Sequence, residues 1–136
     1  MRPLQLLLSS ALLLLSFGCA TTPPTAEEIA NADYGVPVSQ DDAETKASAY
    51  FHNRLKDPMS ATYEWQPVYK GWITEAPIYG GHHRFGYRLD GQVNAKNSFG
   101  GYTGFKQYWL LFQNGEIVSV YGEDSTPYGG YMMKQL

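Results

Sequence analysis

The hydrophobic pattern in the second half of the chain is mostly that of β-strands. From Tyr87 to Lys96, apolar and polar residues alternate, which predicts a strand with one buried and one wet face. Aromatic and polar residues also alternate from residue 63 to 70. Pro67 interrupts this second run and cannot donate a hydrogen bond to a neighbouring strand, so the pattern predicts an edge strand there.

The strongest local signal is the pair Asn114-Gly115, inside an apolar run from Tyr108 to Tyr121. Asn-Gly between strand-forming segments predicts a two-residue hairpin turn, because both turn residues need positive φ. The residues paired by such a turn would be Phe112 with Ile117, Leu110 with Ser119, and Tyr108 with Tyr121. The residues on the opposite face would be Trp109, Leu111, Val118 and Val120. Both faces are apolar, so we expect one to meet a helix and the other to meet the segment 127–133 or a partner.

A helical pattern precedes the strands, from Asp41 to Lys56. Its apolar residues recur at helical spacing and form one stripe, which consists of Ala43, Ala47, Tyr50, Phe51 and Leu55. Two capping-box starts fit the sequence, Ser39 with Asp42 and Asp41 with Glu44. The Asp-Pro pair at 57–58 predicts the end of the helix, because the residue before a proline avoids helical angles.

These patterns together predict the α+β class, with one N-terminal helix packed on an antiparallel sheet of about four strands. The single domain would span residues 41–136. Residues 19–40 contain several Pro and Thr residues, which predicts a flexible tether without a packed face. Residues 1–18 precede this tether as a targeting segment.

The first 18 residues predict a secretory signal peptide. Arg2 is followed by an apolar run from Leu4 to Leu15, which is shorter than the roughly 20 apolar residues of a spanning helix. The run ends in Gly18-Cys19 and resembles the lipobox of bacterial lipoproteins, with Ser16 where the usual Leu stands. The resemblance implies that Cys19 is lipidated and becomes the mature N-terminus, and that Ala20 after it directs the protein to the outer membrane.

Cys19 is the only cysteine in the chain, so an exported form has no internal disulfide. A lipid on Cys19 would anchor the chain firmly, since each buried CH₂ contributes about 0.8 kcal/mol. A reactive thiol is a rival explanation, but a tether offers no fixed base to activate it. Cleavage after Ala20 is another alternative, which would release a soluble periplasmic protein.

The charge balance limits the partners. Removal of residues 1–18 leaves 9 basic and 13 acidic residues, a net charge of −4, and the sequence has no basic cluster. This argues against nucleic acid, whose phosphates require one, and against electrostatic docking on an anionic membrane. The chain has 11 Tyr, 6 Phe and 3 Trp, which can build a core without disulfides or supply a binding surface.

The stretch from Val93 to Phe105 fits either a ligand-cradling loop or the bend of a hairpin. It lacks the phosphate-loop signature Gly-x-x-x-x-Gly-Lys-Ser/Thr and a following helix. We therefore expect a strand up to Lys96, a bend at 97–101 in which Gly100 and Gly101 take positive φ, and a new strand from residue 103. A turn does not need all of its polar and aromatic residues, so the candidate binding residues are Asn94, Lys96, Asn97 and Tyr102.

Two longer motifs resemble a family of small exported bacterial lipoproteins of uncharacterised function. The first is Leu-Lys-Asp-Pro-Met-Ser-Ala at 55–61, and the second runs from Gly91 to Phe105 and has the form Gly-x-Val-Asn-x-Lys-Asn-x-x-Gly-Gly-Tyr-x-Gly. Members often carry a Cys shortly before the second motif, where this chain has Leu89-Asp90. The resemblance implies an exported α+β domain and transfers no catalytic residue. Pro58 and Ser60 also suit a structural turn.

The sequence contains little that indicates catalysis. His52, His82 and His83 are the only histidines, and no metal-binding spacing or nucleophile motif is present, so we expect no metal, no cofactor and no enzyme activity. We expect a non-catalytic binding or structural module of the envelope, with a protein or glycan partner. The alternative is a small cell-wall hydrolase or hydrolase inhibitor, for which we would expect Asp90, His82 or His83 to converge in a deep pocket.

Overall fold

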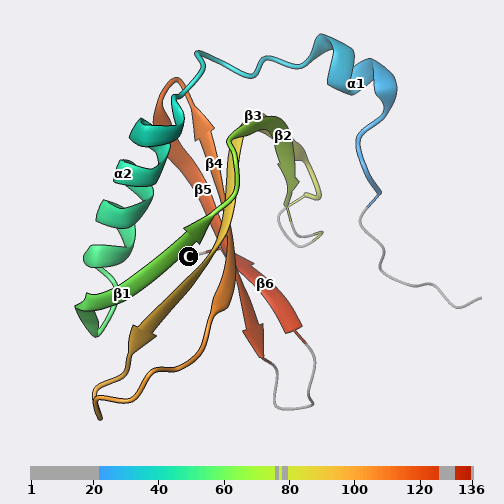
Figure 1. Ribbon diagram of the computed structural model, residues 1–136. Helices are drawn as coiled ribbons and strands as arrows, with labels where there is room; N and C mark the ends of the chain where they lie inside the picture. The colour runs from blue at the N-terminus through green and yellow to red at the C-terminus, as the bar shows by residue number, and fades with distance from the viewer. Residues whose placement is uncertain (1–21, 76, 78–79, 126–130, 136) are drawn as a thin grey trace, which may run out of the picture.

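The computed structural model describes residues 22–75, 77, 80–125 and 131–135. These residues form the predicted α+β fold, in which a helix packs on one antiparallel sheet (Figure 1). The elements are α1 (Ala26–Asn31), α2 (Gln40–His52), β1 (Asp57–Trp65), β2 (Tyr69–Thr74), β3 (His83–Lys96), β4 (Lys106–Gln113), β5 (Glu116–Ser125) and β6 (Tyr131–Gln135). The strands are ordered β1-β3-β4-β5-β6, and β2 also pairs with β3. The described sheet thus has six strands, where the sequence predicts about four.

The long strand β3 organises one edge of the sheet. β1 pairs with its second half and β2 with its first half, so both strands lie along the same side of β3. The predicted single strand at 63–70 is therefore two strands. The ladder breaks at Pro67, which has no N–H, and the N–H of Val68 donates instead to Oε1 of Gln40 at 2.7 Å.

Helix α2 begins after the predicted cap residue Ser39, with one of the two hydrogen bonds of the predicted capping box. The Ser39 hydroxyl accepts a hydrogen bond from the Asp42 N–H. The helix ends at His52, four residues before the predicted end, because the N–H groups of Arg54 and Leu55 both donate to the Phe51 carbonyl and close a turn. The Asp-Pro pair at 57–58 opens β1 instead.

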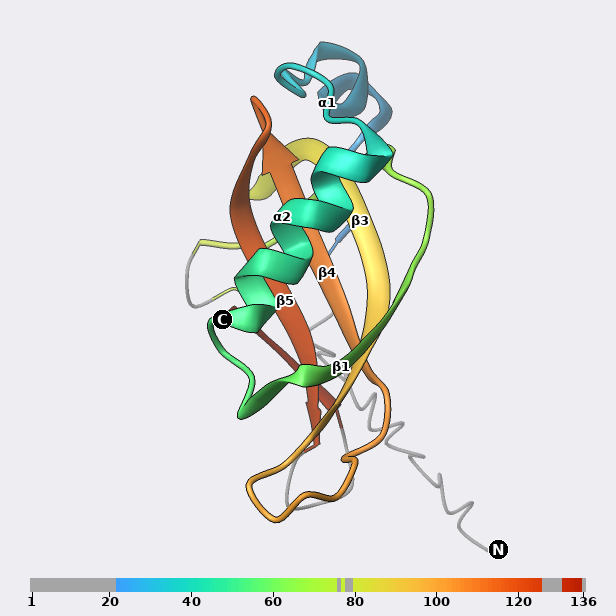
Figure 2. The same ribbon diagram turned by 60° about the vertical axis from the view of Figure 1, so that its left-hand side comes forward.

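The main core lies between α2 and the sheet (Figure 2). Its helix side consists of Ala43, Ala47 and Phe51, which are at most 2% exposed. The Phe51 ring centroid lies 4.7 Å from that of Tyr108 and 6.2 Å from that of Trp65. Such aromatic pairs contribute about 0.5–1.5 kcal/mol beyond burial alone, so Phe51 links the helix to both β1 and β4.

The hairpin of β4 and β5 contains a bulge that the sequence pattern does not predict. Phe112 pairs with Ile117 as predicted, but the register shifts beyond it, and the further pairs are Leu111 with Ser119, Leu110 with Val120, and Trp109 with Tyr121. The other two predicted pairs are therefore wrong by one residue, because Val118 is an extra residue in β5. The bulge turns Val120 toward α2 and Tyr121 to the opposite face, against Leu111 and Ile73.

Residues before α2 also contact the sheet. The Val36 N–H donates to Oδ1 of Asn114 at 3.0 Å, and the Tyr34 ring centroid lies 5.7 Å from that of Phe85. Val38 is buried. The packed fold therefore begins before residue 41, within the segment predicted as a tether. At the other end, β6 pairs with β5, whereas residues 127–130 of the predicted C-terminal cover lie outside the described residues.

Candidate functional site

The loop between β3 and β4 is the hairpin bend that the sequence predicts. β3 ends at Lys96, and Oδ1 of Asn97 accepts hydrogen bonds from the N–H groups of Phe99 and Gly101 at 2.9 and 3.1 Å. Gly100 has a φ of 80°, which suits glycine because it lacks a Cβ. Gly101, which was also expected to have positive φ, does not, whereas Gly104 does. Strand β4 begins at Lys106, three residues later than expected.

The four predicted binding residues have different surroundings. Lys96 and Tyr102 pair through their backbones, and the Lys96 Nζ lies 5.4 Å from the centre of the Tyr102 ring. The Asn97 side chain accepts the two backbone hydrogen bonds that hold the loop. Asn94 is half-buried, and its Oδ1 is buried without a hydrogen-bond partner in the described part of the chain. The structure thus brings together Lys96, Asn97 and Tyr102 at the loop, while Asn94 lies farther back on β3.

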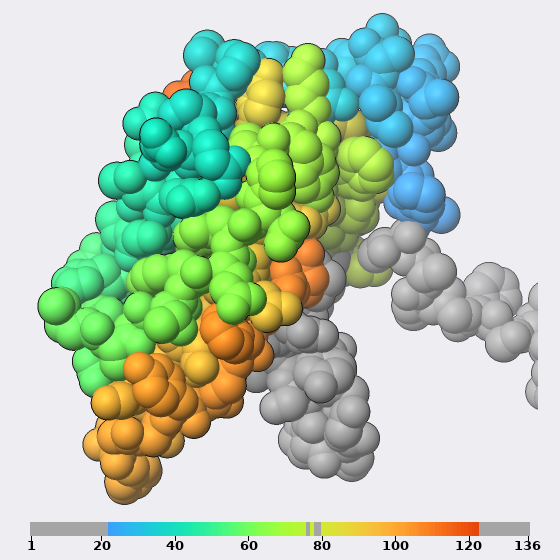
Figure 3. All heavy atoms as spheres, viewed as in Figure 1, coloured from blue at the N-terminus to red at the C-terminus, as the bar shows by residue number. Residues whose placement is uncertain are grey.

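Large apolar side chains are exposed around this loop. Phe99 is 96% exposed, Tyr102 55% and Phe105 46%, and Met59 at the facing start of β1 is 85% exposed. The ring of a fully exposed Phe is not removed from water on folding, so it contributes nothing to the stability of the fold. We call residues 97–105 the distal loop, because they lie at the far end of the molecule from α1 (Figure 3).

The two sequence motifs meet beside the distal loop. The Ser60 hydroxyl donates to the Asp57 carbonyl at 2.8 Å and accepts from the Lys96 N–H at 2.9 Å. Asp57 also pairs with Lys96 in the ladder. Ser60 therefore fixes the end of β3 from which the distal loop departs, which gives both motifs a common structural role.

A cleft opens between the end of α2 and the sheet, next to the distal loop. We call it the cation-lined cleft, and its volume is about 190 Å³. Its basic lining residues are Arg54, Lys56, Lys96 and Lys106, and Leu55 and Val93 are among its apolar ones. The sequence does not predict this cluster, because it has no run of basic residues. The basic residues come from the turn after α2, the end of β3 and the start of β4.

The ion pairs leave the charge of this cleft unbalanced. Eight Lys and Arg side chains are described, and three of them, Lys46, Arg84 and Arg88, form ion pairs. The remaining five form none with described residues, and four of these five line the cation-lined cleft. A second hollow of about 270 Å³ beside α2 differs in this respect, because its Lys46 is paired with Glu116 at 2.8 Å.

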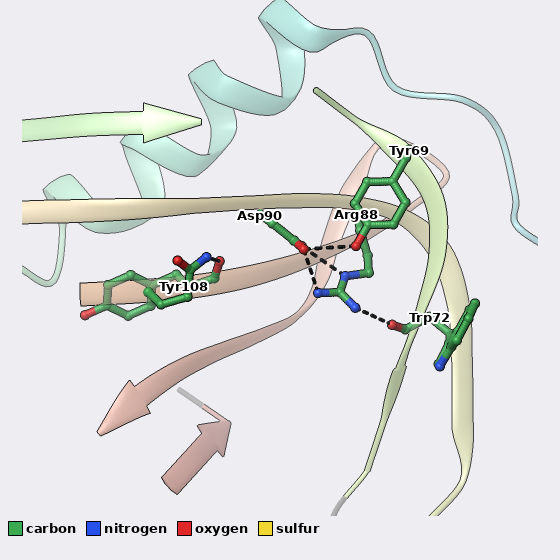
Figure 4. A network of polar contacts seen from close by, with 6 residues as sticks. Tyr69, Trp72, Arg88, Asp90 and Tyr108 are labelled. Carbon is green, nitrogen blue, oxygen red and sulfur yellow. Dashed lines mark hydrogen bonds and ion pairs between the residues drawn. The ribbon is translucent and has the colours of Figure 1, made fainter. Parts of the chain in front are cut away.

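A separate polar network joins β2 and β3 (Figure 4). Arg88 donates twice to the Asp90 carboxylate, at 3.0 and 2.8 Å, and once to the Trp72 carbonyl at 3.0 Å. The Tyr69 hydroxyl donates to the same carboxylate at 2.9 Å. Burial, and then this hydrogen bond, raise the pKa of Tyr69 to about 12. Every charged group in the network has a partner, so we assign it a structural role.

The histidines do not join Asp90 in a common site. Nδ1 of His83 lies 3.0 Å from the Thr74 hydroxyl, and His82 is exposed. Asp90 follows His83 by seven positions along β3, which corresponds to about 23 Å along a strand. Within the described ranges, no group of three or more His, Cys, Asp or Glu side chains could hold a metal ion.

The described helices include none that is long and apolar enough to cross a membrane. Cys19, the predicted lipid attachment site, lies outside the described residues. The sequence matches no family model, and no curated protein or solved structure is significantly similar to it. What the fold and site define is thus a small α+β domain with an exposed aromatic loop beside a cation-lined cleft.

Proposed function

We propose that this chain is a non-catalytic binding module of the bacterial cell envelope, anchored in the outer membrane through a lipid on Cys19 and facing the periplasm. The observation that carries the proposal is the exposure of Phe99, Tyr102 and Met59 at one end of the fold. Exposed apolar groups gathered in one place mark contact sites, and aromatic residues are enriched among the anchors of interfaces.

The position of the N-terminal end supports this orientation. Only three peptide units separate Cys19 from Thr22, a span of at most about 11 Å, and Pro24 is already buried. A lipid on Cys19 would therefore hold the α1 end close to the membrane. The distal loop lies at the opposite end in both ribbon views (Figures 1 and 2), so it would point into the periplasm, toward an envelope protein or glycan.

The surroundings of Asp90 favour binding over hydrolysis. A general acid or base must be able to exchange its proton with a substrate, whereas both oxygens of Asp90 accept hydrogen bonds from Arg88 and Tyr69. A small cell-wall hydrolase would need a carboxylate or histidine in a pocket, free to exchange its proton. The lining of the cation-lined cleft has neither group, and Glu116 in the lining of the second hollow is ion-paired with Lys46 at 2.8 Å. An inhibitor of such a hydrolase could use the distal loop.

Site-specific photo-crosslinking in intact cells tests the proposal. A photoreactive residue at position 99 should give crosslinked envelope products, and the same residue at position 70, on β2, should give few. Cys19→Ala should move the protein from the outer-membrane fraction to the soluble periplasm and reduce the crosslinks at position 99. Equal products from both positions, or turnover of cell-wall fragments by the purified chain, would contradict a non-catalytic module.

A further inference from the structure

We propose that the cation-lined cleft binds an oxyanion, a carboxylate or phosphate that is attached to a sugar of an envelope glycan. The proposal goes beyond the binding module described above, because it names a second site beside the distal loop and the chemistry of its ligand. It does not depend on the lipid at Cys19.

The first argument is the concentration of charge. The chain carries a net charge of −3, yet the fold brings Arg54, Lys56, Lys96 and Lys106 around a single cleft. Like charges repel one another, so the cluster is a cost to folding unless something neutralises it. The nearest acid along the chain, Asp57, forms no ion pair with described residues. The unbalanced charge fits an anionic ligand.

The second argument is that aromatic rings hold two of these cations while leaving their charge unpaired. The Arg54 guanidinium carbon lies 3.7 Å from the centre of the Tyr50 ring, and its Nη1 donates to the Tyr50 carbonyl at 3.3 Å. Lys96 lies over Tyr102. Cation–π contacts orient a cation without neutralising it, so these side chains lose less freedom when an anion binds.

The third argument is the size and floor of the cleft. A volume of about 190 Å³ is below the roughly 300–1,000 Å³ of sites that enclose a drug-sized ligand. The cleft therefore accommodates one end group and not a chain. Leu55, Val93 and Ala95 contribute apolar surface to its lining, which suits the carbon skeleton of the sugar that bears the anion.

Calorimetric titration of the full chain in a non-ionic detergent at low salt tests this site. The probes are N-acetylmuramic acid, which carries a carboxylate on its sugar, N-acetylglucosamine 6-phosphate, which carries a phosphate, and N-acetylglucosamine as the neutral sugar. We expect one or both anionic probes to bind and the neutral sugar not to bind. The difference between the two anionic probes identifies the source of the oxyanion. Added salt should weaken the binding, because it screens exposed charges.

Variants locate the binding. Lys96→Gln combined with Lys106→Gln should weaken it at least about tenfold, since hydrogen bonds to charged groups contribute about 1.5–3 kcal/mol each. Lys70→Gln is the matched control, because Lys70 is exposed on β2 outside the cleft, and it should change the affinity less than about twofold. Circular dichroism checks folding, and Lys56→Gln in the exposed turn replaces the double variant if that variant unfolds.

Three results would overturn the oxyanion site. These are equal binding of the neutral sugar, no binding of either anionic probe, and an equal loss of affinity in Lys70→Gln and in the cleft variants. None of these results would change the crosslinking expected at position 99, so the failure of this site and the failure of the proposed function are distinguishable.

Discussion

Gly91→Ala is the substitution whose outcome the geometry of the sheet predicts most sharply. Gly91 is buried on β3 and pairs with Trp65 of β1. A Cβ added at this position would lie 2.6 Å from the Glu64 carbonyl oxygen and 2.9 Å from Cζ3 of the Trp65 ring. The indole therefore covers the face of the glycine, and the added methyl would have to displace both the ring and the backbone of β1.

The expected loss follows from two opposing effects. Overpacking a well-filled core costs about 1–3 kcal/mol. Replacing glycine by alanine also restricts the unfolded chain, which by itself would stabilise the fold by about 0.4–1 kcal/mol. We therefore expect Gly91→Ala to lower the free energy of unfolding by about 1–2 kcal/mol. Displacement of Trp65 would also disturb its stacking on Tyr63, whose ring centroid lies 5.6 Å away.

Urea unfolding followed by circular dichroism and tryptophan fluorescence measures this loss, and Gly101→Ala is the control. A Cβ at position 101 would meet nothing nearer than Oδ1 of Asn97 at 3.8 Å, and Gly101 is not among the glycines with positive φ. The control should change the free energy of unfolding by less than about 0.5 kcal/mol, as most surface substitutions do. Equal stability of Gly91→Ala and wild type would refute the close packing of Trp65 on β3.

Three further predictions concern the core residue Phe51, the loss of stability at alkaline pH, and the hydrogen bond between Val36 and Asn114. Phe51→Ala should lower the free energy of unfolding by about 3–5 kcal/mol in the same urea assay, and a loss below about 1 kcal/mol would contradict the central position of its ring. The pKa of Tyr69 is raised from 10.0 to about 12, so the folded chain keeps a proton that the unfolded chain releases, and stability should fall between pH 10 and pH 12. Because Tyr69 is 43% exposed, solvent screening reduces the expected fall to about 1 kcal/mol. Tyr69→Phe should flatten the pH dependence, and an unchanged slope would contradict this origin. Asn114→Ala removes the acceptor for the Val36 N–H at a residue with a φ of 52°, and should cost about 1–2 kcal/mol; no loss in thermal unfolding would show that residues before α2 do not stabilise the fold.

The sequence predicts the parts of the fold that depend on local chemistry. The Ser39 cap, the buried face of α2, the alternating strand that ends at Lys96 and the Asn114-Gly115 turn are all present. Each of these features depends on neighbouring residues or on a single period of side chains. Local patterns therefore sufficed for the fold class and for most element positions.

The errors fall where distant contacts decide the structure. The bulge at Val118 depends on how β5 matches β4 beyond the turn, which no pattern in β5 itself reveals. The predicted helix is four residues too long. The Phe51 carbonyl accepts hydrogen bonds from the N–H groups of Arg54 and Leu55, and the resulting turn ends the helix before Asp57. The tether was predicted to reach residue 40, whereas Val36 and Val38 contact the sheet region.

The site was predictable only in part for the same reason. The distal loop has enough unusual residues to attract attention in the sequence, and Lys96 and Asn97 from that prediction line the cation-lined cleft. Arg54 and Lys106 lie more than 50 residues apart in the sequence and meet only when the turn after α2 packs beside β3 and β4. Charge clusters that are assembled from single residues in this way leave no run of basic residues to detect.

The central claim is that the cation-lined cleft beside the distal loop binds an oxyanion of an envelope glycan. Cosedimentation of the full chain with isolated, protein-free cell-wall glycan tests it most directly. We predict that the wild-type chain and Lys70→Gln sediment with the glycan at low salt, and that Lys96→Gln combined with Lys106→Gln stays in the supernatant. Equal sedimentation of all three chains, or none by the wild type, would contradict the claim.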